Sequence, residues 1–297
     1  MINGDSTFLR EIGSRGQAPG EFQGNPVVHV GLQGTVYVLD IEINRLTVFA
    51  PDDHEFVSTT RLIRNGPNTG KLARLVPVTH YILLVEYEYS PFRAVEEGRR
   101  AFWQLTLFDR SGQVLQDSVA AGPLWEAVEV VNTSGRRVHF PRLFGRETIY
   151  ALSPDNMIYY GWNEQIRLKA VTLQGGSARE VDVPHTAVRV TSAEVDKEVR
   201  PFPDLAATLR QDVHDTKTAF SAMVADDEGR LWVKLSWPEG AIETTWLIVN
   251  AKSGEVVATA SLPTDAEILI IRDGKAYGYE PVPRAAAAIV LVWDIMQ

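Results

Sequence analysis

The chain contains no cysteine, which excludes disulfide bonds and thiolate chemistry. This absence does not decide the compartment, because many exported bacterial proteins also lack cysteine. No apolar run approaches the roughly 18 residues that a membrane-spanning helix needs. Residues 1–5 contain neither the basic nor the apolar part of a signal peptide. The sequence as given therefore predicts a soluble protein with no membrane span.

Basic residues are fewer than acidic residues in this chain. The chain has 29 lysine and arginine residues against 38 aspartate and glutamate residues, a formal net charge of −9. The basic residues are scattered, and Arg99-Arg100 and Arg136-Arg137 are pairs, not stripes. Nucleic acids and anionic membranes attract basic patches, so we expect neither as the main partner.

Motifs that carry chemistry are also missing. The six histidines are spread along the chain without His-x-His or His-Glu-x-x-His spacing, and no Gly-x-Ser-x-Gly elbow occurs. The sequence therefore predicts no catalytic residue, no metal site and no cofactor. A metal site assembled from distant parts of the fold stays open, and His29 and His80 are its first candidates because they lie at or next to predicted inner strands.

What the chain does contain is a fivefold recurrence of an apolar strand followed by a polar or glycine-containing turn. The strand occurs at residues 46–49, 105–108, 168–171, 246–249 and 289–292. A period of roughly 40–50 residues filled with short strands is typical of a β-propeller, in which each repeat forms one blade. We therefore expect an all-β fold of four-stranded blades, in one domain that spans residues 1–297.

The alternating, β-branched segments predict strands a to d of each blade, counted outward from the propeller axis. The first blade is expected at residues 27–62, the second at 72–119, the third at 148–183 and the fourth at 220–261. The fifth, at residues 268–294, has only three strands. We expect residues 6–12 to supply its missing outer strand by pairing with residues 288–294, which would leave no unpaired edge there.

One stretch, residues 184–218, breaks the strand pattern. Thr191 and Glu194 have capping-box spacing, which predicts a short helix over residues 193–199 that stops at Pro201. A second helical run follows at residues 204–213. The insertion connects strand d of one blade to strand a of the next, so we expect it on the same face as the loops between strands b and c. It is either a packing appendage or a cover over a ligand.

The N-terminal part resembles a known repeat. Residues 8–13, the loop Gly16-Gln17-Ala18-Pro19-Gly20-Glu21-Phe22 and residues 36–49 resemble the NHL repeat and, more closely, the bacterial six-bladed β-propeller family, which is TolB-like. The segment Asp226-Asp227-Glu228-Gly229-Arg230-Leu231-Trp232-Val233 is similar to the Asp-x-x-Gly-x-Leu-Trp-Val strand pair of that family. The resemblance implies six blades and a periplasmic or extracellular location. Five repeats are visible, so the chain is a five-bladed ring or has lost inner strands upstream of Met1.

Aromatic residues fall at or after the ends of successive b strands, where they would surround the channel mouth. Together with nearby carboxylates they suit a sugar, a peptide or a small cyclic ligand. The candidate ligand-binding residues are Trp162, Trp237, Tyr89, Glu164 and Glu239, with Phe92 and Tyr279 in comparable places. Packing between blades also uses aromatic residues, so a structural role stays open for each.

Two polar pairs have competing interpretations. Asp40 and Arg45 flank a b–c turn and are expected to bond each other, with a ligand role as the alternative. Glu86 and Glu88 share one face near another b–c loop, where they form either a solvated strand end or an acid–base pair. We expect a monomeric, non-catalytic propeller that recognises a small molecule, a glycan or a protein. The alternative is a propeller hydrolase or lyase with a metal or an acid pair at the channel mouth.

Overall fold

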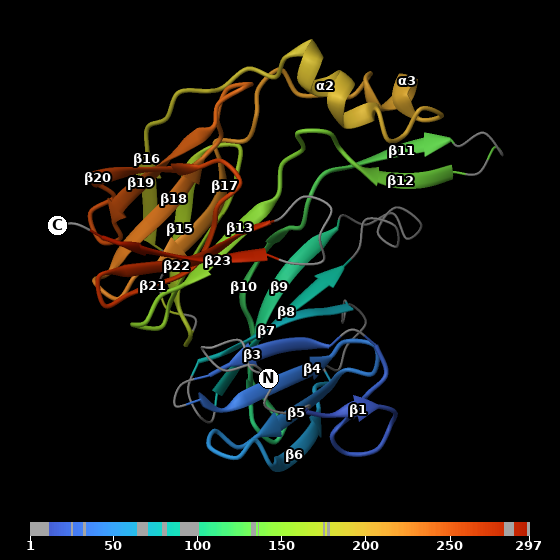
Figure 1. The fold of residues 1–297 in the computed structure, drawn as a ribbon, viewed down its shortest axis with the longest axis vertical. Helices are drawn as coiled ribbons and strands as arrows, with labels where there is room; N and C mark the ends of the chain where they lie inside the picture. Colours follow the sequence, from blue (N-terminus) through green and yellow to red (C-terminus); the bar gives the residue numbers. More distant parts are fainter. Residues whose placement is uncertain are drawn as a thin grey trace. The chain divides into compact units, whose positions relative to one another are not determined.

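The computed structural model describes residues 12–24, 26–31, 34–63, 71–78, 82–89, 101–131, 135, 137–174, 176, 179–281 and 288–295 (Figure 1). The chain divides into two compact units. Unit 1 comprises Met1–Ser90 and Phe102–Ala121, and unit 2 comprises Pro91–Ala101 and Gly122–Gln297.

Unit 1 contains two four-stranded antiparallel sheets whose strands follow chain order. The first has β3 (Val27–Val30), β4 (Val36–Asp40), β5 (Arg45–Phe49) and β6 (Phe56–Arg61). The second has β7 (Lys71–Pro77), β8 (Ile82–Tyr89), β9 (Phe102–Asp109) and β10 (Val114–Pro123). Both match the first two predicted blades.

The central strands of unit 1 are apolar on both faces, which suits a sheet that packs against neighbours on both sides. Tyr37 and Leu39 of the first sheet share a buried cluster with Leu75, Val85 and Phe108 of the second. Burial of such side chains stabilises each by about 1.5–3 kcal/mol relative to exposure. Sheet-on-sheet packing of this kind is how one blade supports the next.

The glycine-rich loop before β3 forms no helix and packs along the first sheet. Its short strands β1 (Ser14–Arg15) and β2 (Glu21–Phe22) pair in parallel. Phe22 is buried against Val36, Val38 and Phe49. Gly13 and Gly20 have φ of +79° and +84°, which only glycine adopts readily. The glycines therefore serve the turns of this loop, and Phe22 packs it against the first sheet.

Asp40 and Arg45 anchor this loop and do not form an ion pair with each other, contrary to our expectation. The Asp40 carboxylate accepts a hydrogen bond from the Gln23 backbone N–H at 2.7 Å. Arg45 donates to the carbonyl oxygens of Gln17, at 2.7 Å, and Glu21. Both side chains are buried, so each forms its hydrogen bonds with nearby backbone groups.

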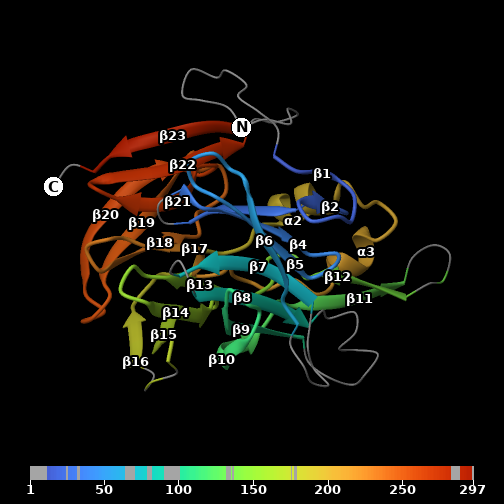
Figure 2. The ribbon, with the colours of Figure 1, turned by 90° about the horizontal axis from the view of Figure 1, so that it is seen from below.

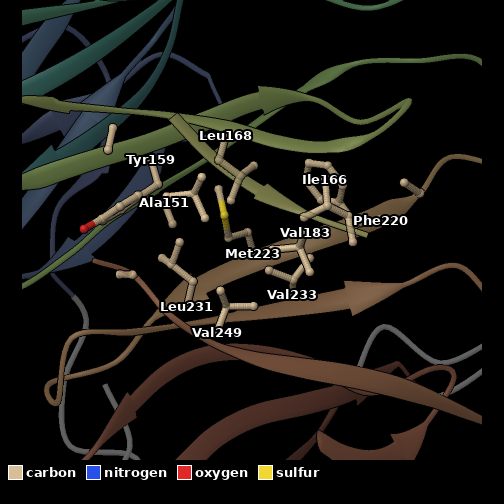
Figure 3. Packing of buried hydrophobic residues seen from close by; sticks show 14 residues of the cluster. Ala151, Tyr159, Ile166, Leu168, Val183, Phe220, Met223, Leu231, Val233 and Val249 are labelled. Atoms are coloured by element: carbon tan, nitrogen blue, oxygen red, sulfur yellow. The ribbon is translucent and has the colours of Figure 1, made fainter. Parts of the chain in front are cut away.

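Unit 2 contains three further sheets in chain order. The first consists of β13 (Thr148–Leu152), β14 (Met157–Trp162), β15 (Ile166–Thr172) and β16 (Arg179–Val183). The second consists of β17 (Phe220–Ala225), β18 (Arg230–Leu235), β19 (Glu243–Asn250) and β20 (Val256–Pro263). The third consists of β21 (Glu267–Arg272), β22 (Lys275–Pro281) and β23 (Ala288–Asp294). Figure 3 shows Leu168 and Tyr159 of one sheet packed with Met223 and Val233 of the next.

The five sheets together define an all-β protein of the β-propeller class, with four-stranded blades. The last sheet has three strands among the described residues, with β23 beside β22 (Figure 2). Its proposed completion by residues 6–12 lies outside the described residues except for Ile12. No helix within the described part of the chain is long and apolar enough to span a membrane.

Sequence reasoning missed one element, the hairpin of β11 (Ala127–Val131) and β12 (Arg137–Pro141). It lies between the second and third blades in the sequence. Its Val128 and Val130 are buried against Val199 and Leu209, which lie in the 184–218 insertion. The alternation of apolar and polar residues in Val128-Glu129-Val130 was the available signal.

The insertion forms two short helices, α2 (Ser192–Val199) and α3 (Ala206–Leu209), that cover this hairpin (Figure 1). The predicted capping box is confirmed: the Thr191 side chain accepts from the Glu194 N–H at 3.2 Å, and Glu194 accepts from the Thr191 N–H at 3.1 Å. The second helix is shorter than expected, with four residues.

Candidate functional site

The insertion in unit 2 is fastened to the loop between β18 and β19. The Thr191 hydroxyl donates to the Glu239 carboxylate at 2.6 Å, and the Lys217 ammonium donates to the Trp237 carbonyl oxygen at 2.6 Å. The Ala219 N–H also bonds the carbonyl oxygen of Asn163, in the loop after β14, at 2.7 Å. Within unit 2 the insertion therefore contacts two loops that connect b and c strands.

Lys217 also forms an ion pair with Glu194 inside the insertion, and both side chains are largely buried. Burial raises the pKa of the Glu194 carboxyl, but hydrogen bonds from Lys217 and Thr191 and the Lys217 charge outweigh it, so the net pKa is lowered. Glu194 therefore stays ionised and holds the helix cap and the lysine together. The lysine in turn holds the carbonyl oxygen of Trp237.

A second set of contacts joins the insertion to the base of the β11–β12 hairpin. The Glu126 carboxylate contacts His214 Nε2 at 2.6 Å and accepts from the Arg146 backbone N–H at 2.9 Å. Arg142 lies between Glu126, at 3.4 Å, and Asp212 of the insertion. Burial raises the pKa of Glu126, but its hydrogen bonds with His214 and the Arg146 N–H and its electrostatic interactions with His214 and Arg142 outweigh this and lower it overall.

Arg146 is buried behind this contact. Its guanidinium donates to the Thr216 carbonyl oxygen at 3.0 Å, the Thr216 hydroxyl at 3.1 Å and the Phe144 carbonyl oxygen at 3.0 Å. Burial lowers its pKa, while the charges of Glu164 and Glu126 act in the opposite direction. The guanidinium thus contacts neutral oxygens only, and Glu164 lies within electrostatic range of it.

The segment around Asn163 brings together three side chains that bond no other described residue. The buried Asn163 side chain accepts from the Glu147 N–H at 2.9 Å. Trp162 pairs with Thr148 at the start of β13 and is half-buried, whereas Glu164 and Glu147 are exposed. Surrounding protein raises the pKa of the Glu147 carboxyl by desolvation, although the group remains open to water. We call Trp162, Glu147 and Glu164 the rim site.

The other predicted tryptophan, Trp237, has a cation over its ring. Trp237 is half-buried, and the ammonium of Lys234 lies 5.2 Å from the centre of its ring. That ammonium also donates to the carbonyl oxygens of Thr264 and Ala266, each at 2.9 Å. A cation over an indole is a favourable contact that fixes the ring. Of the predicted residues, Glu239 is likewise occupied, by Thr191.

The remaining candidates lie elsewhere or outside the described residues. Glu86 is buried, with its carboxylate 3.9 Å from Arg74, and Glu88 pairs in register with Lys71. His29 lies in β3, where burial and the Arg74 charge lower its pKa. Phe92, His80 and the side chain of Tyr89 are not described. Tyr279 is half-buried in β22.

Within the described ranges, no three histidine, cysteine, aspartate or glutamate residues gather in a way that could hold a metal ion. The polar residues that shape the site were missed by sequence reasoning. Glu126 and His214 are 88 positions apart, so neither has a local signal.

The chain matches no family model and no curated protein sequence. Similar solved structures include a Bacteroides fragilis protein described as exported, with 13% identity and a TM-score of 0.46 over 94% of this chain and 72% of that chain. Virginiamycin B lyase from Staphylococcus aureus matches with 10% identity and a TM-score of 0.39, over 92% and 85%. The β-propeller domain of the Trilobed protease from Pyrococcus furiosus has 9% identity and a TM-score of 0.35, over 75% and 54%. These similarities carry no argument about activity.

Proposed function

We propose that this protein is a non-catalytic recognition propeller whose rim site binds a small polyhydroxylated ligand of the sugar class. The observation that carries the proposal is that one half-buried indole and two exposed carboxyl groups, all next to Asn163, bond no other described residue. An indole face stacks on the apolar face of a sugar ring, and carboxylates accept hydrogen bonds from its hydroxyl groups.

The surroundings of the rim site favour binding by a rigid surface. Asn163 fixes the backbone of Glu147, and Asn163 in turn accepts from Ala219. Arg146 lies within electrostatic range of Glu164 and holds the Thr216 segment of the insertion. A site whose backbone is already ordered loses less entropy when it binds a ligand. Loops on a rigid scaffold are common places for such sites.

A glycan library, followed by calorimetry with the best ligand, tests the proposal. Trp162→Ala should lower the affinity at least about tenfold, since a buried aromatic contact contributes more than about 1.4 kcal/mol. Glu164→Gln should lower it less, because the amide keeps one acceptor. Trp237→Ala should have the smaller effect of the two tryptophan variants, because its ring already faces Lys234.

Glu180→Gln is the matched control, since Glu180 is an exposed carboxylate in the outer strand β16 of the same blade. Its affinity should equal that of the unmodified protein. No binding by any glycan, or equal affinity for Trp162→Ala and the control, would show that the rim site does not recognise sugars.

A hydrolase or lyase is the second candidate, and the raised pKa of the open Glu147 carboxyl is the observation that favours it. A carboxyl that stays protonated nearer to neutral pH can act as a general acid. Prolonged incubation with a bound glycan distinguishes the two functions. Recovery of intact glycan supports recognition, whereas cleavage that Glu147→Gln abolishes without loss of binding supports catalysis.

We extend the proposal to family and location. The residues that resemble the bacterial six-bladed propellers support membership of that NHL-like and TolB-like family, a periplasmic or extracellular location, and one propeller domain for both units. Fractionation of cells that express the natural gene tests the location. Recovery of the protein only with cytoplasmic markers would contradict it.

A further inference from the structure

A cavity of about 440 Å³ lies within the insertion, between the first turn of α2 and residues 213–216. Its volume falls in the range of small-ligand sites, at the lower end. Arg189, Ser192, His214 and Asp215 contribute polar groups to its lining, and Val195 and Val213 contribute apolar walls. The cavity is separate from the rim site, because it shares none of the three rim residues.

A short antiparallel contact sets the direction of the side chains around this cavity. Arg189 pairs with Thr216, and the flanking hydrogen bonds run from Val190 N–H to Asp215 oxygen at 3.0 Å and from Lys217 N–H to Val188 oxygen at 2.8 Å. In this arrangement the directly opposed side chains lie close together on one side. Arg189 and Thr216 therefore share a side of this contact, and Asp215 and Val190, which also line the cavity, share the other.

Two arginine side chains, Arg146 and Arg189, lie at this side of the contact. Arg146 donates two hydrogen bonds to Thr216, and none of its direct partners is charged. Its Nε atom is buried without a hydrogen-bond partner. Arg189 is exposed, and its guanidinium contacts no carboxylate among the described residues. Glu164 and Glu126 lie within electrostatic range of Arg146, and Glu126 also contacts His214 and Arg142.

We propose that the cavity binds a small organic carboxylate. The Arg189 guanidinium donates parallel hydrogen bonds to the carboxylate of the ligand. The positive charge of Arg146, which contacts Thr216, adds to the electrostatic attraction of that carboxylate. Val195 and Val213 contact a short apolar tail, and the Ser192 hydroxyl contributes a further donor at the cavity wall. A ligand of this class has one anionic group, and the rest of the molecule is small enough to fit in the cavity.

Titration of the isotope-labelled full chain with butyrate, followed by amide chemical shifts, tests the site. Sodium chloride keeps the ionic strength equal in every sample, because exposed charges are screened by salt. Butyrate should shift the amides of residues 189–192 and 213–216 saturably. Butyramide and butylamine, which have the same length without the negative charge, should leave them unchanged.

Two variants separate recognition from general charge effects. Arg189→Gln should weaken butyrate binding at least about tenfold, since it removes a charge-assisted hydrogen bond. Arg210→Gln is the control, because Arg210 pairs with Asp196 on the surface and does not line the cavity. It should bind butyrate as the unmodified protein does, and so should Trp162→Ala.

Inorganic phosphate and butylamine supply the outcomes that would overturn the assignment. Phosphate that binds these residues more tightly than butyrate would show an oxyanion site without selectivity for carboxylates. Equal shifts with butylamine, or equal butyrate affinity in Arg189→Gln, would show that Arg189 does not bind the ligand. Absence of saturable shifts with butyrate would reject the site itself, and none of these results bears on glycan binding at the rim site.

Discussion

The Trp232 indole N–H donates a hydrogen bond to the Asp226 carboxylate at 3.0 Å, and both side chains are buried. The same carboxylate accepts from the Arg230 guanidinium at 2.6 Å and from the backbone N–H groups of Glu228 and Arg230. One carboxylate therefore orders the turn between β17 and β18 and fixes the tryptophan of the next strand. This explains in physical terms why an aspartate stands six residues before a tryptophan in the segment that resembles the six-bladed family.

Trp232→Ala should destabilise unit 2 by about 3–5 kcal/mol, because it leaves a large cavity between two sheets. Trp232→Phe should cost about 1–3 kcal/mol, since it keeps most of the ring and leaves Asp226 without one donor. Urea unfolding followed by circular dichroism measures both. Trp162→Ala, at a half-buried position, serves as the comparison and should cost less. A loss below roughly 1 kcal/mol for Trp232→Ala would contradict its role in the core.

Lys234 provides a second test of the core. Its buried ammonium donates to the Thr264 and Ala266 carbonyl oxygens and pairs with Glu267 at 3.0 Å. Lys234→Ala should destabilise the protein by about 2–5 kcal/mol, because it leaves a cavity and removes the donor to both carbonyl oxygens. Lys234→Met should cost less, since it keeps the packed side-chain volume. Thermal unfolding of both variants checks this order, and equal stability of all three proteins would refute it.

The blades could be predicted because their information is local. Residues 288–294 were predicted as a strand with the bounds of β23, and Thr191 with Glu194 predicted a cap that needs only four consecutive residues. The β11–β12 hairpin was missed because its strands were read as part of the connection between two blades. Its stability depends on Val199 and Leu209, which come about 70 residues later in the chain.

The site was predictable only in part, for the same reason. Topology placed Trp162, Glu164 and Trp237 at b-strand ends, where the structure has them. Glu239 was also placed correctly in its loop, but no local pattern could show that Thr191 occupies its carboxylate. The Glu126 contact with His214 and the Arg146 contact with Thr216 join residues 70 or more positions apart. Such contacts form only after the blades pack.

Acidification should loosen the insertion through Glu126. The pKa of Glu126 in the folded protein lies below its ordinary value of 4.5, so its ionised form stabilises the fold. That stabilisation is fully present above the ordinary value and is lost as the pH falls through the lowered pKa. Hydrogen exchange of residues 212–217, corrected for intrinsic rates, should therefore accelerate in acid.

Two glutamine variants identify the group that is responsible. Glu126→Gln should exchange faster at neutral pH and respond less to acid, because its side chain no longer titrates. Glu129→Gln is the control, since Glu129 pairs with Arg137 on the exposed surface of the same hairpin. If Glu129→Gln alone removed the acid response, the assignment to Glu126 would be wrong.

Deletion of residues 191–213 should separate the role of the insertion in folding from its role in binding. The deletion removes Val199 and Leu209, so β11 and β12 should lose protection from hydrogen exchange. The sheets from β13 to β23 should stay protected, because their cores use side chains outside the deleted segment. The Glu239 carboxylate loses Thr191, and Lys217 loses Glu194, so the loop that carries Trp237 becomes less ordered.

The affinity for the selected glycan should therefore fall in the deletion variant, because the ligand must order a loop that the insertion otherwise holds. Lys217→Met is the matched variant, since it keeps both helices and removes only the bond to the Trp237 carbonyl and the pair with Glu194. It should lower the affinity in the same direction by a smaller factor. Calorimetry with the two variants decides the question, and unchanged affinity in the deletion variant would make the insertion a cover for the β11–β12 hairpin without a part in recognition.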